Sequence, residues 1–151
     1  MLWKRKQTLR AIASGKVIPL EAVGDGVFSM KMMGDGFAVS QHNGQIYSPI
    51  AGIVKMIFPT KHAITIESND GTVLLIHMGI DTVELKGIPF SLKVREGQSV
   101  SSKTLLAEID MEKLDQENKD TTVLVVLPDG PKGKLVKVNK QVSVNEKVFV
   151  F

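Results

Sequence analysis

The sequence contains no cysteine among its 151 residues, which excludes a disulfide scaffold, a cysteine zinc site and a cysteine nucleophile. Aromatic residues make up only 5%, with one Trp and one Tyr, so the core must rest on valine, isoleucine and leucine. No apolar run approaches the ~20 residues that span a bilayer. The opening stretch MLWKRKQTLRAIASGK has positive charge but lacks the apolar region of a signal peptide. We therefore expect a cytoplasmic protein.

Nucleotide-binding loops are also missing, because neither G-x-x-x-x-G-K-[ST] nor G-x-G-x-x-G occurs. The net charge is only +3, and part of it sits in the leader at Lys4-Arg5-Lys6. Basic stripes interleaved with aromatic residues, which are typical of nucleic-acid binding, are absent. We expect no nucleic-acid partner and at most a peripheral contact of the leader with an anionic membrane.

What the chain does contain is short apolar runs separated by turn signals such as GDG, HNG, SNDG, EGQS and PDGPKG. Regularly spaced short strands of this kind predict an all-β fold, an antiparallel sandwich or barrel with few short helices. MEKLDQENK, at 111–119, is the clearest helical stretch. The length suits one domain, which we place at 11–151, after a basic leader at 1–10.

A weak internal repeat is present. Residues 98–106, QSVSSKTLL, resemble residues 142–150, VSVNEKVFV, and Gly15-Lys-Val echoes Gly52-Ile-Val. Each member of the first pair has a lysine just before an apolar run. The repeat predicts two related half-motifs packed together in one sandwich.

Two histidines flank a predicted hairpin, HAITIE at 62–67 and TVLLIH at 72–77. If Asn69 and Asp70 form a two-residue turn, His62 lies opposite His77 with Cβ atoms ~5 Å apart. A turn shifted by one residue would leave the two histidines diagonal on the same face, whereas a three-residue loop would break the register unless a bulge restored it. On the shared face we expect Ile64, Ile66, Val73 and Leu75.

The residues alone leave several chemistries open. His62, His77 and Asp81 could hold a hydrolytic zinc, since catalytic zinc takes three protein ligands. Met30-Lys31-Met32 matches the tripeptide that carries biotin in carrier domains. Two neighbouring imidazoles also suit covalent phosphoryl carriage, one as nucleophile and the other as stabiliser, with Thr60 and Lys61 as further donors. His42, in QHNG, reads as an exposed turn residue with no role.

HMGIDTVELKG, at 77–87, closely resembles the phosphorylation-site signature of the glucose-type enzyme IIA family of the bacterial phosphoenolpyruvate-dependent sugar phosphotransferase system. The resemblance extends in order through VFSMKMMGDGFAV, SPIAGIV, KHAITIES and EGQSV, and covers nearly all of 11–151. It implies an antiparallel β-sandwich. It also implies a phosphotransferase component that takes phosphate from the phosphocarrier HPr and gives it to an enzyme IIB during sugar uptake.

The resemblance assigns roles residue by residue. His77 matches the phosphorylated histidine, and His62 matches the histidine that stabilises the phosphate. Thr60 matches a threonine beside the pair, and Asp81 an acidic position flanking it. The family's partner-docking surface is matched by Phe28, Phe58, Val83 and Asp35. No cofactor is required, although in some relatives the two histidines hold zinc at a partner interface, which would make His62 and His77 metal ligands here.

Departures from the family are modest. Lys61 stands where some members have asparagine, and Leu75 and Met78 stand where some have phenylalanine. These differences bear on regulatory partners more than on phosphotransfer. The start at Met1 and the lack of a fused membrane segment favour a free-standing protein, and the alternative is a piece excised from a larger permease. The main alternative is a regulatory binding protein of the same fold that does not turn over phosphate.

Overall fold

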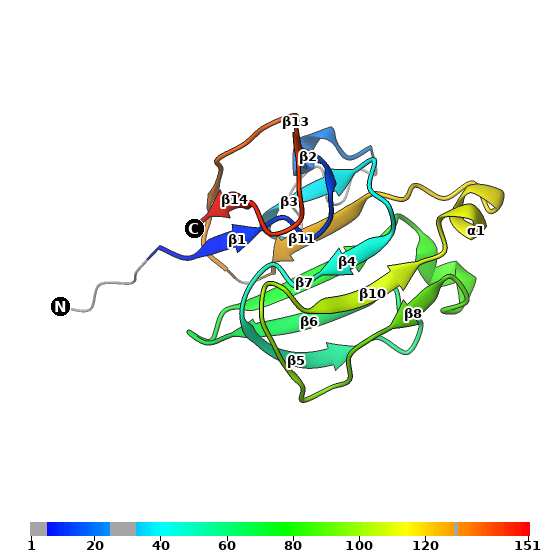
Figure 1. Cartoon of the computed structure of the whole chain (residues 1–151), viewed down its shortest axis with the longest axis horizontal. Coiled ribbons are helices and arrows are strands. Elements are labelled where there is room, and N and C mark those ends of the chain that lie inside the picture. The colour runs from blue at the N-terminus through cyan, green and yellow to red at the C-terminus, as the bar shows by residue number, and fades with distance from the viewer. Residues whose placement is uncertain (1–5, 25–32, 129) are drawn as a thin grey trace.

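Antiparallel strands dominate the protein. The computed structural model describes residues 6–24, 33–128 and 130–151. Its largest sheet has eight strands, in the order β13 (Lys140–Val142), β2 (Gly15–Pro19), β3 (Asp35–Ser40), β11 (Val123–Leu127), β7 (Val73–Met78), β6 (Ala63–Ser68), β5 (Gly52–Ile57) and β9 (Ser99–Val100). In Figure 1 this order runs from the top of the view down to β5.

Two three-stranded sheets accompany the large one. They are β1 (Thr8–Arg10), β14 (Lys147–Val150) and β12 (Lys134–Leu135), and β4 (Gln45–Tyr47), β10 (Leu105–Ile109) and β8 (Phe90–Leu92). The helical elements are α1 (Met111–Gln116) and the 3-10 turns η1 (Leu20–Ala22) and η2 (Thr82–Leu85). Every strand pairing in the described residues is antiparallel. The predicted all-β class with few short helices is therefore confirmed.

The topology also confirms two related half-motifs. β2 begins at Gly15, which pairs with Val142 of β13, and β5 begins at Gly52, which pairs with Val100 of β9. The first half consists of β1–β3 and β11–β14, and the second half consists of β4–β10. Each half contributes four strands to the large sheet and builds one small sheet. The second half is inserted into the first between β3 and β11.

The predicted alignment of the repeat was shifted by two residues. The turns that match are Ser101–Thr104 and Ser143–Glu146, because each is closed by a bond from the fourth backbone N–H to the first carbonyl, at 3.0 and 3.2 Å. In each turn the fourth side chain also accepts a bond from the first N–H, at 2.9 and 2.8 Å. The hydrogen bonds of the two turns therefore align the half-motifs better than the lysine that precedes each apolar run.

Strand alternation divides the apolar residues between the two faces of the large sheet. One face packs with the small sheets in the main core, whose largest fully buried side chains include Phe37, Ile64, Ile66, Ile76, Met78, Leu106 and Phe149. The other face carries a smaller buried cluster, Leu20, Val23, Ala38, Ala63, Leu75, Leu124 and Val126. This second cluster forms the floor beneath the histidine pair.

The first described residues belong to the packed domain. Leu9 of β1 is fully buried, and Gln7 exchanges backbone hydrogen bonds of 2.8 and 3.0 Å with Phe151. The packed domain therefore begins before residue 11, where we expected it to start after a leader at 1–10. No helix among the described residues has the length and apolar character to cross a membrane.

Candidate functional site

His77 lies on the outer face of the large sheet, near the end of β7. Its strand neighbours are Ala63 on β6 and Leu124 on β11, so its partly exposed ring stands on the smaller apolar cluster. Its Nδ1 lies 2.7 Å from the carbonyl oxygen of Gly79. Because a carbonyl only accepts, Nδ1 must carry the proton. The lone pair of the neutral ring is therefore on Nε2, which is the nucleophilic atom.

The predicted pairing of His62 opposite His77 is wrong by one residue. Asn69, Asp70 and Gly71 form a three-residue loop, in which Ser68 N–H bonds to the Thr72 carbonyl at 2.8 Å. Ala63 consequently lies opposite His77. A slip of one residue moves side chains to the other face of a strand.

The expected shared face is divided by the same slip. Ile64 and Ile66 point into the main core, whereas Leu75 stays on the outer face in the smaller cluster. Val73, two residues from Leu75, remains 41% exposed. Of the four apolar residues predicted to accompany the histidines, the two on β6 therefore lie behind the sheet.

The histidines nevertheless meet, because His62 precedes β6 and is not part of the regular strand. The preceding turn is closed by a bond of 2.7 Å from Lys61 N–H to the Phe58 carbonyl, and Lys61 has a left-handed φ of 59°. This turn brings the His62 ring to the outer face. The ring centroids of His62 and His77 lie 5.0 Å apart, with an interplanar angle of 77°.

His62 is the more enclosed of the two rings, with 6% of its surface exposed. Its Nδ1 lies 2.5 Å from Thr60 Oγ1, and the edge of Phe58 lies against it with centroids 5.5 Å apart. Burial, and then the charge of His77, lower the pKa of His62 to about 4. His62 is therefore neutral near pH 7 and can donate through one ring nitrogen only.

Asp81 and Val83 lie a few residues after His77, in the segment that follows β7. Asp81 is exposed, with a left-handed φ of 59°, and precedes η2. Val83 is 48% exposed. The segment between His77 and η2 is held by Thr82, whose buried hydroxyl donates to the Met78 carbonyl at 2.6 Å, and by a 2.9 Å bond from Gly79 N–H to the Thr122 carbonyl. These bonds fix the carbonyl that orients His77.

Of the predicted site residues that the structure describes, Asp35 is the one that lies away from the pair. It lies opposite Leu127, at the far end of β11 from His77. Two strand spacings and three residue steps separate it from His77, roughly 14 Å. Its carboxylate accepts backbone N–H bonds from Gly36 at 2.8 Å and Gly133 at 2.9 Å. Phe28 and Met30-Lys31-Met32 lie outside the described residues.

His42 is not the exposed turn residue that the sequence predicts. It is 8% exposed, its Nε2 lies 2.7 Å from the Thr121 carbonyl, and its Nδ1 accepts a 3.0 Å bond from Gly44 N–H. Desolvation by burial lowers its pKa. It connects the β3–β4 turn to the segment that enters β11. A polar QHNG turn gave no local signal of this burial.

A metal would find only two ligands here. His62 and His77 each have Nδ1 in a hydrogen bond, so a metal ion would bind through Nε2. Among the described residues no group of three His, Cys, Asp or Glu could hold a metal ion, so Asp81 does not complete a site with the pair. Two histidines fit a zinc ion only where another protein supplies further ligands.

The structure thus combines an antiparallel sandwich with a pair of histidines in contact on the outer face of its large sheet. Residues 7–132 match the model of the family described as phosphoenolpyruvate-dependent sugar phosphotransferase system, EIIA 1. The chain belongs to this family. The predicted resemblance is thus confirmed, as is its placement among the components of a sugar phosphotransferase system.

The proteins that are similar to this chain include the following two curated relatives and a solved structure. The glucose-specific EIICBA component of a Streptococcus pneumoniae strain is 45% identical over 93% of the chain, and that of Staphylococcus carnosus is 38% identical over 90%. The chain spans about a fifth of their length, 19% and 20%. Glucose permease IIA from Mycoplasma capricolum superposes with a TM-score of 0.87 at 30% identity, over 99% of both chains.

Proposed function

We propose that His77 carries a phosphoryl group, which it accepts from phosphorylated HPr and donates to an enzyme IIB during sugar uptake. The observation that carries this proposal is the bond from His77 Nδ1 to the Gly79 carbonyl. It places the lone pair of the neutral ring on Nε2 and holds the ring in one orientation. A neutral imidazole needs no deprotonation before it acts as a nucleophile.

In the accepting step, His77 Nε2 attacks the phosphorus of the donor's phosphohistidine. A new N–P bond forms, the bond to the donor imidazole breaks, and its electron pair returns to the donor nitrogen. In the donating step, a nucleophilic sulfur of enzyme IIB attacks the same phosphorus, and the pair returns to His77. Neither step requires a metal or a nucleotide.

His62 and Thr60 stabilise the phosphoryl group in this mechanism. When the Thr60 hydroxyl donates to His62 Nδ1, the proton of neutral His62 resides on Nε2. That N–H then serves as a donor for phosphate oxygens on the neighbouring His77, a preorganised donor of the kind that stabilises transferring charge. Asp81, exposed beside the pair, would meet basic side chains of an incoming partner.

The partner docks on an apolar rim around the pair. Phe58 packs against His62, and Val83 is 48% exposed on η2. Ile88 is 73% exposed, and its neighbour Gly87 lies against the Thr60 backbone. Asp35, whose carboxylate accepts the Gly133 N–H at the other end of β11, would contact a partner only at the edge of this surface. Small contact areas of this type suit transient complexes.

The proposal includes the remaining sequence-based expectations. Zinc, if it binds, is held by His62 and His77 together with ligands from a regulatory target. The domain works in the cytoplasm, where phosphoenolpyruvate is produced. The sugar follows from the other components of the system, and the free-standing or fused state of this chain does not alter the transfer step.

The test is to incubate the chain with phosphoenolpyruvate, enzyme I and HPr, and to weigh it under alkaline conditions that preserve phosphohistidine. We expect one phosphoryl group on His77 and none on the His77→Gln variant. The His62→Gln variant should accept phosphate yet donate it to enzyme IIB about 10²-fold more slowly, the usual loss when one oxyanion donor is removed.

Two outcomes decide between the functions. Phosphorylation of the His77→Gln variant would show that another residue is the acceptor. An unmodified wild-type chain beside phosphorylated HPr would favour a regulatory protein that binds partners without turnover. Far-UV circular dichroism of each variant serves as the folding control, and the Thr60→Ser and Thr60→Val pair separates the hydroxyl from the shape of the side chain.

A further inference from the structure

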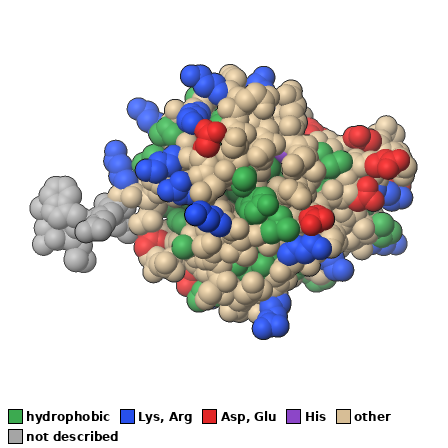
Figure 2. Space-filling model, in the orientation of Figure 1, with side chains coloured by type: hydrophobic (Ala, Val, Ile, Leu, Met, Phe, Trp, Pro, Cys, Tyr) green, Lys and Arg blue, Asp and Glu red, His purple; other side chains and the backbone are tan. Residues whose placement is uncertain are grey.

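The two halves of the fold differ in charge although their strands match. The described part of the first half carries eight basic against three acidic side chains, whereas the second half carries eight against eleven. Figure 2 shows Lys and Arg concentrated over the end of the molecule that holds the chain termini, with acidic side chains at the α1 end. Because one sandwich architecture is built with either balance, its stability does not require the basic excess.

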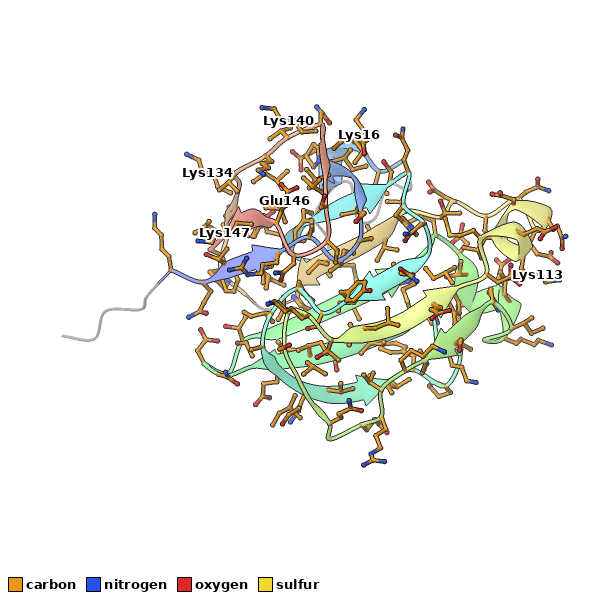
Figure 3. The ribbon with its side chains drawn as sticks, in the orientation of Figure 1. Lys16, Lys113, Lys134, Lys140, Glu146 and Lys147 are labelled. Carbon is orange, nitrogen blue, oxygen red and sulfur yellow. The ribbon has the colours of Figure 1, made fainter. Side chains whose placement is uncertain are left out.

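The lysines at this basic end gather despite their mutual repulsion. Arg10 and Lys147 are cross-strand partners, and Lys140 on β13 lies one pair along from Lys16 on β2. Like charges placed opposite one another on a sheet are destabilising. Figure 3 shows Lys16, Lys134, Lys140 and Lys147 on the same side of the molecule. Such a cluster is expected where an anionic partner offsets the repulsion.

A cavity with an apolar wall opens among these lysines. It has a volume of about 450 Å³. Its lining comprises Lys6, Lys132, Gly133, Lys134, Val136, Val150 and Phe151. A lining that combines three lysines with valine and phenylalanine side chains suits a ligand with an anionic head and an apolar body.

At the cavity and in the residues that follow it, exposed valines alternate with the lysines. Val136 is 52% and Val138 is 45% exposed, within the stretch KLVKVNK at 134–140. Lone exposed apolar residues are common, but two large ones between exposed lysines form the pattern of a membrane-surface contact, where apolar side chains enter the interface and cations meet the headgroups.

Two of the described acidic side chains contact the segment from Gly133 to Lys137. Glu146 forms an ion pair with Lys137, and the Asp35 carboxylate holds the Gly133 N–H at 2.9 Å. Lys132, Lys134, Lys140 and Lys147 are all exposed. The Asp35 carboxylate keeps its charge in its bond to Gly133, so the positive field at this end comes from the balance of eight basic against three acidic side chains. It extends about one Debye length, roughly 8–10 Å, into ordinary salt.

We infer that the basic end, formed by Lys6, Lys132–Lys140 and Lys147 with Val136 and Val138, docks on an anionic phospholipid surface. The arrangement leaves the histidine pair accessible, because β11 begins beside His77 and ends at Leu127, before the basic segment. A domain held in this way would present its transfer site to partners while bound. The inference is independent of phosphorylation, so either can fail without the other.

The test is co-sedimentation of the purified chain with vesicles of phosphatidylcholine alone, or of phosphatidylcholine and phosphatidylglycerol in equal parts. We expect binding to the anionic vesicles only, weakening as salt increases. Replacing Lys134, Lys140 and Lys147 by Gln should lower the partition coefficient by on the order of 100-fold, since each lysine near an anionic surface contributes about fivefold. Val136→Ser with Val138→Ser should lower it further.

A matched control removes the same charge elsewhere. Lys93, Arg95 and Lys103 are exposed in the second half, and their replacement by Gln should leave vesicle binding within about threefold of wild type, as expected outside the contact. An equal loss in both triple variants, or no binding to anionic vesicles, would overturn the inference. Binding that is insensitive to the valine changes and equalled by soluble polyglutamate would also overturn it, in favour of an acidic protein partner.

Discussion

At the scale of single residues, one side-chain type acquires three different states from its surroundings. His77 donates from Nδ1 to the Gly79 carbonyl and keeps Nε2 for chemistry. His62 is bonded to Thr60 and loses basicity. His42 is bonded at both nitrogens and supports a turn. The three histidines differ in which ring nitrogen has a fixed partner. A backbone carbonyl is such a partner for His77 and His42, whereas the partner of His62 is the Thr60 hydroxyl.

Stability should depend on pH through His62. Its folded pKa of about 4 lies below the usual value of 6.5, so the unfolded chain binds more protons between these values. The free energy of unfolding therefore falls as pH falls from about 6.5 to about 4. The full shift would correspond to about 3 kcal/mol, and screening at the surface reduces our expectation to about half of that.

Urea unfolding of the wild type and the His62→Gln variant at a series of pH values measures this contribution. His42, whose pKa is also lowered by burial, adds a dependence of the same sign. Only the difference between the two proteins therefore reports on His62. Equal slopes in both proteins across this pH window would contradict the assignment.

Phosphorylation should reverse the state of His62. A phosphoryl group on His77 places negative charge beside the His62 ring, and a nearby anion favours the protonated imidazole. We expect the pKa of His62 to rise above about 4 on phosphorylation, and NMR titration of its ring signals would measure the change. An unchanged value would mean that the phosphate points away from His62.

At the scale of elements, turn length decides which face a residue occupies. The loop Asn69–Gly71 has one residue more than a two-residue turn, and this puts Ala63 opposite His77. The left-handed Lys61 then returns His62 to the outer face. Two local departures from regular geometry thus produce the contact that a single regular hairpin would also have produced.

Glycine is required at the first position of β2 and of β5, because the next strand passes too close to leave room for a Cβ atom. A Cβ on Gly52 would lie 2.2 Å from the Glu67 carbonyl oxygen, and one on Gly15 would lie 2.4 Å from that of Ser40. Gly52→Ala should therefore lower the free energy of unfolding by about 3 kcal/mol, the upper range for overpacking. Thermal and urea unfolding would measure the loss.

Gly24 supplies the matched control. A Cβ there would meet none of the described residues within 4 Å, so Gly24→Ala should change stability by no more than about 0.5 kcal/mol. Similar losses in the two variants would show that the effect does not come from the approach of the strands.

At the scale of the whole molecule, the inserted topology makes one cooperative unit. β7 of the second half pairs with β11 of the first, and the main core contains buried residues of both halves. Neither half can bury its face of the sheet alone. We therefore expect a single unfolding transition, as is usual for domains of this size.

Leu106 and Val148 occupy matching positions in the two halves, and both are fully buried. Leu106→Ala should lower the free energy of unfolding by roughly 2–5 kcal/mol, and Val148→Ala should shift the same transition. NMR signals of the histidines report on the second half, and those of Phe37 and Phe149 on the first. Separate midpoints for the two sets would show that the halves unfold independently.

Much of the fold could be predicted because its signals are local. Short apolar runs with Gly, Asn and Asp between them indicate antiparallel strands, and Gly15-Lys-Val with Gly52-Ile-Val marks equivalent strand starts. Local signals also misled in places. The lysines at 103 and 147 suggested a repeat two residues out of register, and polar QHNG concealed a buried His42.

The class of fold, the two-half organisation and the identity of the residues that can do chemistry follow from the amino-acid sequence alone, because these depend on periodicity, turn residues and side-chain type. The register of β6 on β7, the tautomer of His77, the low pKa of His62 and the separation of Asp35 from the pair follow from the folded chain and could not be read from the sequence. Each of these depends on which backbone group lies a few ångströms from a given atom, and distant segments of the chain supply many of those groups.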